Sequence, residues 1–377
     1  MPSIGVWIVT AALIAALPST AGAREPAACV NGMDRENFSY WPPGARPRGS
    51  DPRIGAAKPA TDEERRALHP VLWPNDLSAR DSLRTWLIEA RFECLEEAFG
   101  DLDRAGVRFA SGVPKVVSFL GAMADFLDAK GGLTAHELDD FMSAWKQAQP
   151  QSLLPDLLWP RLLSAAAWHA RGYGPYAETT PDMRALFARF NAEAWKHVQD
   201  SPQAVRAHRL WFHTSLLALA DNPDRRSELE ATALEAVRRF PDDLQMPVIA
   251  ALRLTPGWGA TPERFEAFAQ QVRQIQQDTV GARGYAFVYT RSLPMQQVVQ
   301  HPAVDLRTLR KGLLEAANED SPDDIARLQA FACQTRDAAA LLTAQARWKA
   351  YAAKPQVYGP TQPPVACRTW LETLPKS

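Results

Sequence analysis

Residues 81–103 read DSLRTWLIEARFECLEEAFGDLD, and this stretch sets the pattern for most of the chain. Its apolar residues recur at steps of three and four, and others widen the same stripe: Leu83, Leu87, Ala90, Cys94 and Ala98, with Trp86, Leu95, Phe99 and Leu102. Such spacing gathers apolar side chains on one face of an α-helix. The stretch therefore predicts one amphipathic helix over residues 81–103.

Similar apolar spacing continues downstream, over residues 115–129, 135–148, 157–171, 181–199, 202–220, 226–240, 262–279, 306–318, 323–335 and 338–352. Several starts carry a capping residue before a proline, which suits the first helical position because its missing N–H needs no partner there. These pairs are Thr180-Pro181, Ser201-Pro202, Thr261-Pro262 and Ser321-Pro322, and Thr134 with Glu137 forms a capping box. Strand signals are confined to Val116-Val117, Val298-Val299 and residues 286–289, which fit strand or helix. The pattern predicts an essentially all-helical body.

Helices of moderate length that are joined by short turns can form either an open α-solenoid or a closed helical bundle. Over residues 61–354 we predict a divergent α-solenoid of antiparallel helix pairs, similar to tetratricopeptide (TPR) repeats. The spacing between capped starts is irregular and follows no standard repeat length. A closed multi-helix bundle is therefore the alternative.

The two ends of the chain differ from this body. Residues 1–23 are typical of a signal peptide: the apolar run from Ile4 to Leu17 is shorter than the roughly 20 residues of a spanning helix, and Ala21 and Ala23 suit cleavage after Ala23. No Lys or Arg precedes the run, so an uncleaved anchor is the alternative. We expect a periplasmic or secreted protein with no transmembrane segment after cleavage. Residues 24–60 predict a Pro/Gly-rich extended arm, and residues 355–377 a Pro-rich tail with a short final helix.

The chain has four cysteines: Cys29, Cys94, Cys333 and Cys367. An even number in an oxidising compartment favours two disulfides. The simplest of the three connectivities joins Cys29 with Cys94 and Cys333 with Cys367. The alternative is that Cys94 and Cys333, both within apolar helical patterns, are buried thiols.

Charge and motifs exclude several function classes. The 42 basic and 43 acidic residues nearly cancel, so we expect no nucleic-acid partner. No nucleophile elbow, zinc-protease motif, phosphate loop or calcium loop occurs. Glu193 and His197 share a helix face, with His208 and His213 downstream, but a zinc site needs three or four converging ligands. We therefore predict no catalytic residue, metal site or cofactor.

Aromatic and glycine landmarks follow in a characteristic order: Trp168-His-Ala-Arg171-Gly172 with Tyr173-Gly174, Phe190 to Trp195, Leu254-Thr-Pro-Gly-Trp258-Gly259, Phe265 to Phe268, Gly284-Tyr285-Ala286 with Tyr289, and Phe331-Ala-Cys333 with Asp337. In this order the chain resembles a bacterial family termed domain of unknown function 4034. The resemblance spans roughly residues 83–348 and implies a helical, repeat-like architecture with no catalytic residues. Two positions depart from the family pattern: Ala260 follows Trp258-Gly259 in place of a second Gly, and His169 stands where an acidic residue is typical.

Trp168, Arg171 and Trp258 are the candidate ligand-binding residues, because apolar pockets with one charged group are common binding sites. The favoured function is a protein- or peptide-binding scaffold in the cell envelope, whose partner is a protein or peptide. The alternative is a cell-envelope enzyme that acts on glycan or peptide.

Overall fold

A computed structural model describes residues 76–354 except 105, 175 and 319–320. Within this part the prediction of an all-α fold is confirmed, because it holds sixteen α-helices, no strand, and one isolated β-bridge between Arg108 and Pro114. The predicted signal peptide (1–23), N-terminal arm (24–60) and C-terminal tail (355–377) lie outside the described residues. None of the described helices is long and apolar enough to cross a bilayer.

The α-helices are α2 (Asp76–Ile88), α3 (Phe92–Leu102), α4 (Ser118–Ala129), α5 (Ala135–Ala148), α6 (Leu154–Arg171), α7 (Pro181–Asp200), α8 (Gln203–Arg206), α9 (Arg209–Ala220), α10 (Arg226–Arg239), α11 (Gln245–Arg253), α12 (Pro262–Val280), α13 (Arg283–Ser292), α14 (Met295–Gln300), α15 (Leu306–Ala316), α16 (Pro322–Thr335) and α17 (Ala338–Ala352). Short 3₁₀ turns are η3 (Lys115–Val117), η4 (Tyr176–Glu178), η5 (Pro223–Arg225) and η6 (Pro256–Trp258).

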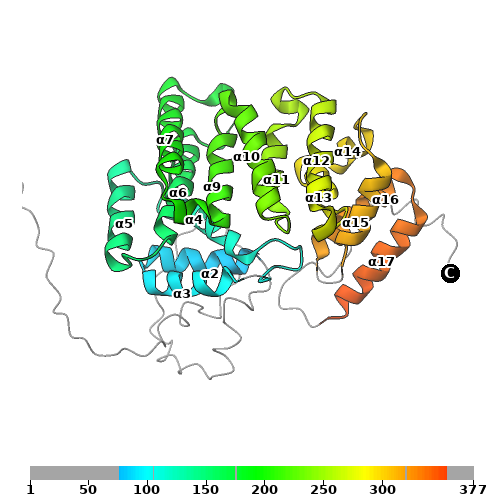
Figure 1. Ribbon diagram of the computed structural model, residues 1–377, viewed down its shortest axis with the longest axis horizontal. Helices are drawn as coiled ribbons and strands as arrows, with labels where there is room; N and C mark the ends of the chain where they lie inside the picture. The colour runs from blue at the N-terminus through cyan, green and yellow to red at the C-terminus, as the bar shows by residue number, and fades with distance from the viewer. Residues whose placement is uncertain (1–75, 105, 175, 319–320, 355–377) are drawn as a thin grey trace, which may run out of the picture.

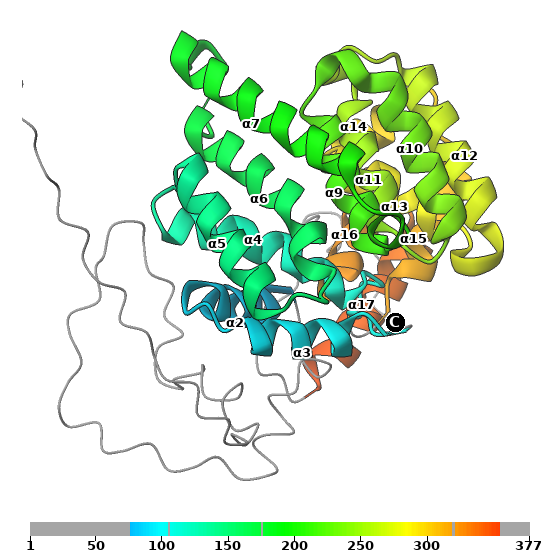
Figure 2. The same cartoon turned by 60° about the vertical axis from the view of Figure 1, so that its left-hand side comes forward.

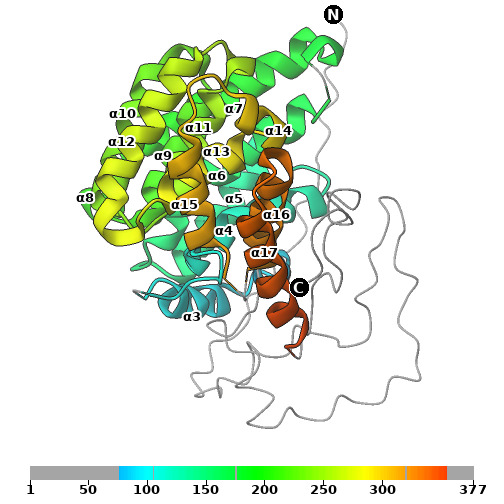
Figure 3. The same cartoon turned by 90° about the vertical axis from the view of Figure 1, so that its right-hand side faces the viewer.

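The helices pack mainly against neighbours in the sequence, in a helical-repeat-like arrangement. Figure 1 shows them following one another from α5 at one end to α17 at the other. Figure 2 shows α6 alongside α7 and α4, and Figure 3 shows α16 beside α17 at the opposite end. Most helices thus pack against helices one or two places away along the chain, as expected of stacked helix pairs.

Helix α9 lies where two large apolar clusters meet. The first cluster runs from Ala79 to Leu210 and the second from Phe212 to Tyr351, with Ala218 returning to the first. Residues of α9 therefore enter both cores, which explains why eight of its twelve residues are buried. Any site beside the end of α9 lies at the junction of the two cores.

The single helix predicted over residues 81–103 is wrong, because the chain turns between α2 and α3. Ala90 adopts a left-handed backbone with φ 51°. The Arg91 N–H donates to the Trp86 carbonyl at 2.9 Å, and the Ala90 N–H donates to the Leu87 carbonyl at 3.2 Å. These two bonds form a Schellman motif, in which Gly is the usual residue at the left-handed position. Alanine at that position hides the stop from the sequence pattern.

Three of the predicted helix starts have the expected caps. Thr134 and Glu137 form the capping box of α5, while the hydroxyls of Thr180 and Thr261 accept backbone N–H bonds from Met183 at 3.2 Å and Arg264 at 3.3 Å. These bonds satisfy N–H groups that lack partners within the first turn.

The predicted cap at Ser201 is wrong, whereas Ser321 is the N-cap of α16 as predicted but makes no side-chain cap bond. The Ser201 hydroxyl donates to the His197 carbonyl at 2.8 Å, in the preceding helix. Pro202 precedes only the four-residue helix α8. Ser321 precedes α16, but its hydroxyl donates to Asp324 at 2.5 Å and accepts no backbone bond.

Every segment whose sequence fits a strand or a helix is helical in the structure. Residues 286–289 lie in α13, Val298 and Val299 lie in α14, and Val116 and Val117 lie in η3. These segments are short and largely buried, and periodicity alone does not distinguish a buried helix from a buried strand.

Residues 107–114 form a strap between the first part of the chain and later helices. The Arg108 guanidinium donates to the Gly112 carbonyl at 2.8 Å and the Asp242 carbonyl at 3.0 Å, and it pairs with the Asp242 carboxylate. The Asn318 side-chain amide donates to the Ala110 carbonyl at 3.1 Å. The strap therefore ties α3 to the segments before α11 and after α15.

Candidate functional site

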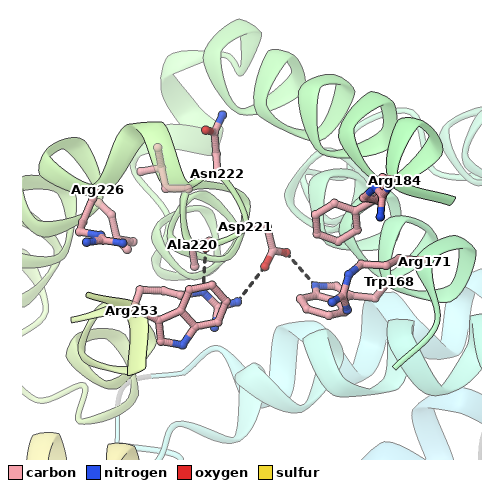
Figure 4. A pocket seen from close by; sticks show the side chains of 12 residues that line it. Trp168, Arg171, Arg184, Ala220, Asp221, Asn222, Arg226 and Arg253 are labelled. Carbon is pink, nitrogen blue, oxygen red and sulfur yellow. Dashed lines mark hydrogen bonds and ion pairs between the residues drawn. The ribbon is translucent and has the colours of Figure 1, made fainter. Parts of the chain in front are cut away.

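A pocket opens at the junction of the two cores, where the ends of several helices converge (Figure 4). Its cavity volume is about 280 Å³. All three candidate residues from the sequence, Trp168, Arg171 and Trp258, line it. The other lining residues are Arg184, Phe187, Leu219, Ala220, Asp221, Asn222, Arg226, Leu229 and Arg253. The structure thus brings together residues from distant parts of the chain, while ligand binding by them remains a prediction.

The end of α6 supplies one aromatic wall. Gly172 adopts φ 77°, which L side chains rarely tolerate, and its N–H donates to the Trp168 carbonyl at 2.9 Å. Trp168 and Arg171 therefore occupy the last helical turn. The Arg171 guanidinium lies 4.9 Å from the centre of the Trp168 ring and 5.8 Å from that of Phe187 on α7. Cation–π contact holds this wall together.

The turn η6 supplies the opposite aromatic side. Gly259 follows it in a left-handed conformation with φ 78°, and its N–H donates to the Pro256 carbonyl at 2.9 Å. This turn leaves Trp258 with 46% of its surface exposed, unusual for an indole of this size. The Arg253 guanidinium stacks 4.3 Å from the centre of the Trp258 ring.

Asp221 joins the two sides at the base of the pocket. Its carboxylate accepts the Trp168 indole N–H at 2.9 Å and an Arg253 N–H at 2.9 Å, shown as dashed lines in Figure 4. Arg253 also donates to the Ala220 carbonyl at the end of α9, at 2.7 Å. Only 6% of the Asp221 side chain is exposed. This burial raises the pKa of Asp221, although the Arg253 charge and the Trp168 hydrogen bond favour the ionised form.

The pocket carries an excess of positive charge, because four arginines and one aspartate line it. Arg171 and Arg226 have no carboxylate within 4.0 Å in the described part of the chain. Arg226 is also the first residue of α10, where the helix dipole is positive. An anionic group entering the pocket would meet uncompensated charge on both sides.

Sequence reasoning missed Asp221, Arg253 and Arg226. Helix α11, which carries Arg253, follows Leu244, which makes no side-chain cap bond, and was not predicted. Asp221 lies in a short break before Pro223, where the sequence indicates only a turn. The contact between Asp221 and Arg253 is tertiary, and no spacing rule along the chain would have found it.

The three histidines considered for a metal site lie in different places and contact different residues. His197 stacks on Trp159 with ring centres 5.0 Å apart, His208 lies 3.0 Å from Asp103, and His213 lies 3.0 Å from Asp243. Among the residues that the structure describes, no group of three or more His, Cys, Asp or Glu side chains is arranged to hold a metal ion.

Cys94 is buried on α3, whereas Cys333 is partly buried on α16. Neither of these described cysteines is a free thiol. Cys29 and Cys367 lie outside the described residues, so the pairing stays a prediction.

The arrangement suits recognition of a ligand that has both an apolar and an anionic part. Asp221 is the only carboxylate among the lining residues, and both of its oxygens already accept hydrogen bonds. The resemblance to domain of unknown function 4034 rests on the sequence motifs alone. Comparison of the chain with protein-family models, curated proteins and solved structures gave no match.

Proposed function

We propose that this chain is an exported helical-repeat protein that binds a peptide, or a peptide segment of a protein, in the cell envelope. The observation that carries the proposal is the meeting of Trp168, Arg171 and Trp258 around one pocket. Helical-repeat proteins commonly bind peptides and proteins on the surfaces that their stacked helices create.

The pocket is organised before any ligand arrives, which favours binding. Trp168 is fixed by Asp221 and by Arg171, and Trp258 is stacked on Arg253. Side chains that are already ordered lose little conformational entropy when a ligand binds. Their exposed ring surfaces supply apolar contact area, as in most small-ligand sites.

The same geometry favours binding over hydrolysis. Glycan hydrolysis typically uses two carboxylates on either side of the scissile bond. In the described pocket Asp221 has no second carboxylate beside it, and its hydrogen bonds commit it to Trp168 and Arg253. We therefore prefer a binding protein to the alternative of a cell-envelope enzyme.

Export is part of the proposal. Residues 1–23 direct the chain out of the cytoplasm, with cleavage after Ala23, and two disulfides form in the mature protein. N-terminal sequencing of the exported protein tests this. A mature chain beginning at Arg24 supports it, and one beginning at Met1 contradicts cleavage.

Capture of peptides from a defined pool tests the binding function. The immobilised mature protein is incubated with a protease digest of envelope proteins, and retained peptides are identified by mass spectrometry. We expect retention that is lost in Trp258→Ala and kept in Leu342→Ala, which removes another exposed apolar side chain on the distant helix α17. Equal retention by the native protein and Trp258→Ala would contradict binding in this pocket.

A further inference from the structure

We infer that the pocket takes the C-terminal residue of a peptide, with its free carboxylate and an apolar or aromatic side chain. This inference rests on the proposed function, because it assumes that a peptide binds in the pocket. It adds the chemical identity of the group that the pocket recognises.

The first argument is charge. Arg171 and Arg226 come from different helices, and Figure 4 shows them on opposite sides of the opening. Neither pairs with a carboxylate in the described part of the chain, whereas Arg253 is neutralised by Asp221. Guanidinium groups form their strongest hydrogen bonds with carboxylates and phosphates. Two uncompensated guanidinium groups therefore favour an anionic ligand.

The second argument is the orientation of the helix ends. Arg171 ends α6, and Arg253 ends α11, so each cation lies at a negatively polarised terminus. Arg226 instead begins α10, where its charge adds to the positive end of the helix dipole. Glu228 in the same first turn pairs with Arg225 at 2.7 Å and so leaves Arg226 uncompensated. This side of the pocket is the stronger anion site.

The third argument is the apolar lining. Between the charged groups the wall consists of Trp168, Phe187, Leu219, Leu229 and Trp258. A simple inorganic anion would leave these surfaces without a contact. An apolar or aromatic side chain would bury against them and remove apolar surface from water, which favours binding.

The fourth argument is size. At about 280 Å³ the cavity is slightly smaller than the usual range of ligand pockets, about 300–1,000 Å³. It has room for one residue rather than for a folded surface. The last residue of a peptide carries a carboxylate and a side chain on the same Cα, so both groups fit one small site. An internal Asp or Glu has its charge on the side chain and lacks a separate apolar group.

Matched peptides test the inference by fluorescence anisotropy with the full mature protein. The probe is a dye-labelled Gly-Ser spacer that ends in Ala-Phe with a free carboxylate, and its partner is the same peptide as a C-terminal amide. We expect the amide to bind at least about tenfold more weakly, since a charge-assisted hydrogen bond is lost. Replacing the terminal Phe of the free-acid peptide with Gly should also weaken binding, because the apolar contact is lost.

Charge variants localise the effect. Arg226→Gln should weaken binding of the free acid about tenfold, Arg171→Gln should weaken it less, and both should change amide binding little. The control is Arg264→Gln, which removes an exposed arginine paired with Glu230 at 2.9 Å, away from the pocket lining. Thermal unfolding of each variant checks that the fold is intact.

Three results would overturn the inference. They are equal binding of acid and amide, tighter binding of an amide peptide with an internal Glu, and equal effects of Arg226→Gln and Arg264→Gln. If acid and amide bind equally and both are lost in Trp258→Ala, the carboxylate inference fails and the proposed function stands. The carboxylate inference also fails, and the proposed function stands, if neither probe binds while the native protein retains envelope peptides that Trp258→Ala does not retain.

Discussion

At the scale of single residues, a fully buried carboxylate lies between α9 and the start of α11, outside the pocket lining. Asp243 and His213 are both fully buried, with His213 Nε2 3.0 Å from the Asp243 carboxylate. The same carboxylate lies 3.2 Å from Arg209 and accepts the Gln245 N–H at 2.9 Å. Burial opposes ionisation, but His213, Arg209 and the Gln245 amide outweigh it and lower the pKa of Asp243 to about 2.

Replacing Asp243 with Asn should destabilise the protein by about 3 kcal/mol at pH 7, because it removes the buried carboxylate that His213 and Arg209 share. Arg209 then keeps only its contact with the partly exposed Asp242, at 3.3 Å. The sign of the pH dependence follows from the lowered pKa. The carboxylate contributes stability above its unfolded pKa of 3.8, and that contribution is lost as pH falls towards 2. The difference between native protein and Asp243→Asn should therefore narrow by about 2 kcal/mol towards pH 2.

Urea denaturation between pH 7 and pH 2 measures this difference. Asp139→Asn, on the exposed face of α5, is the matched control and should leave the free energy of unfolding nearly unchanged. A gap that stays constant with pH would show that the Asp243 carboxylate is not held ionised by its neighbours.

At the scale of elements, the turn between α2 and α3 depends on an unusual alanine. Ala90 has φ 51°, a region that costs a non-glycine residue about 1 kcal/mol. Ala90→Gly should therefore raise the free energy of unfolding or leave it unchanged. Ala144→Gly, at an exposed position inside α5, should lower it by about 1 kcal/mol. Chemical denaturation compares the two variants. An equal decrease in the free energy of unfolding in both would contradict a left-handed backbone at Ala90.

The contact between α13 and α15 depends on Gly312. A methyl group there would overlap the carbonyl oxygen of Ala282 and lie 2.7 Å from the Ala286 Cβ. Because backbone blocks the space, Gly312→Ala should destabilise the protein by about 2 kcal/mol.

Gly100→Ala is the control for this substitution, since nothing lies within 4 Å of the added methyl group on α3. It should stabilise the protein by up to about 1 kcal/mol, because alanine favours a helix. Thermal unfolding of both variants measures the effects, and a neutral Gly312→Ala would mean that α13 and α15 pack less closely than described.

The elements also show how far the sequence alone could lead. Thr134, Thr180 and Thr261 were recognised as helix starts because their caps act within one turn of the chain. Ala90 was missed because alanine is the best helix former, whereas here it occupies a left-handed turn closed by two backbone hydrogen bonds. Helix α11 was missed because it is short and mostly buried, and because Leu244, the residue directly before it, is not a capping residue.

At the scale of the whole molecule, the pocket lies where the two apolar cores meet, beside the end of α9. Trp168, Arg171 and Trp258 stood out in the sequence as large or charged residues beside glycines. Asp221 and Arg253 did not, since their importance comes from a contact that only the packing of α9 against α11 creates. The sequence therefore indicated the walls of the site and missed its base.

Two predicted disulfides, each with one cysteine near an end of the chain, should stabilise the whole molecule. We predict disulfides between Cys29 and Cys94 and between Cys333 and Cys367. Reduction should lower the free energy of unfolding by about 2–4 kcal/mol for each bridge. Mass mapping of the unreduced protein identifies the linked peptides. Free thiols at all four positions, or a link between the two pairs, would contradict the prediction.

The central claim is that the pocket between Trp168 and Trp258 binds a peptide end. Titration of the dye-labelled free-acid peptide with native protein, Trp258→Ala and Leu342→Ala tests it most directly. We predict saturable binding to the native protein and Leu342→Ala, and at least about tenfold weaker binding to Trp258→Ala, because the exposed indole supplies much of the apolar contact. Equal affinity for all three proteins would contradict the claim.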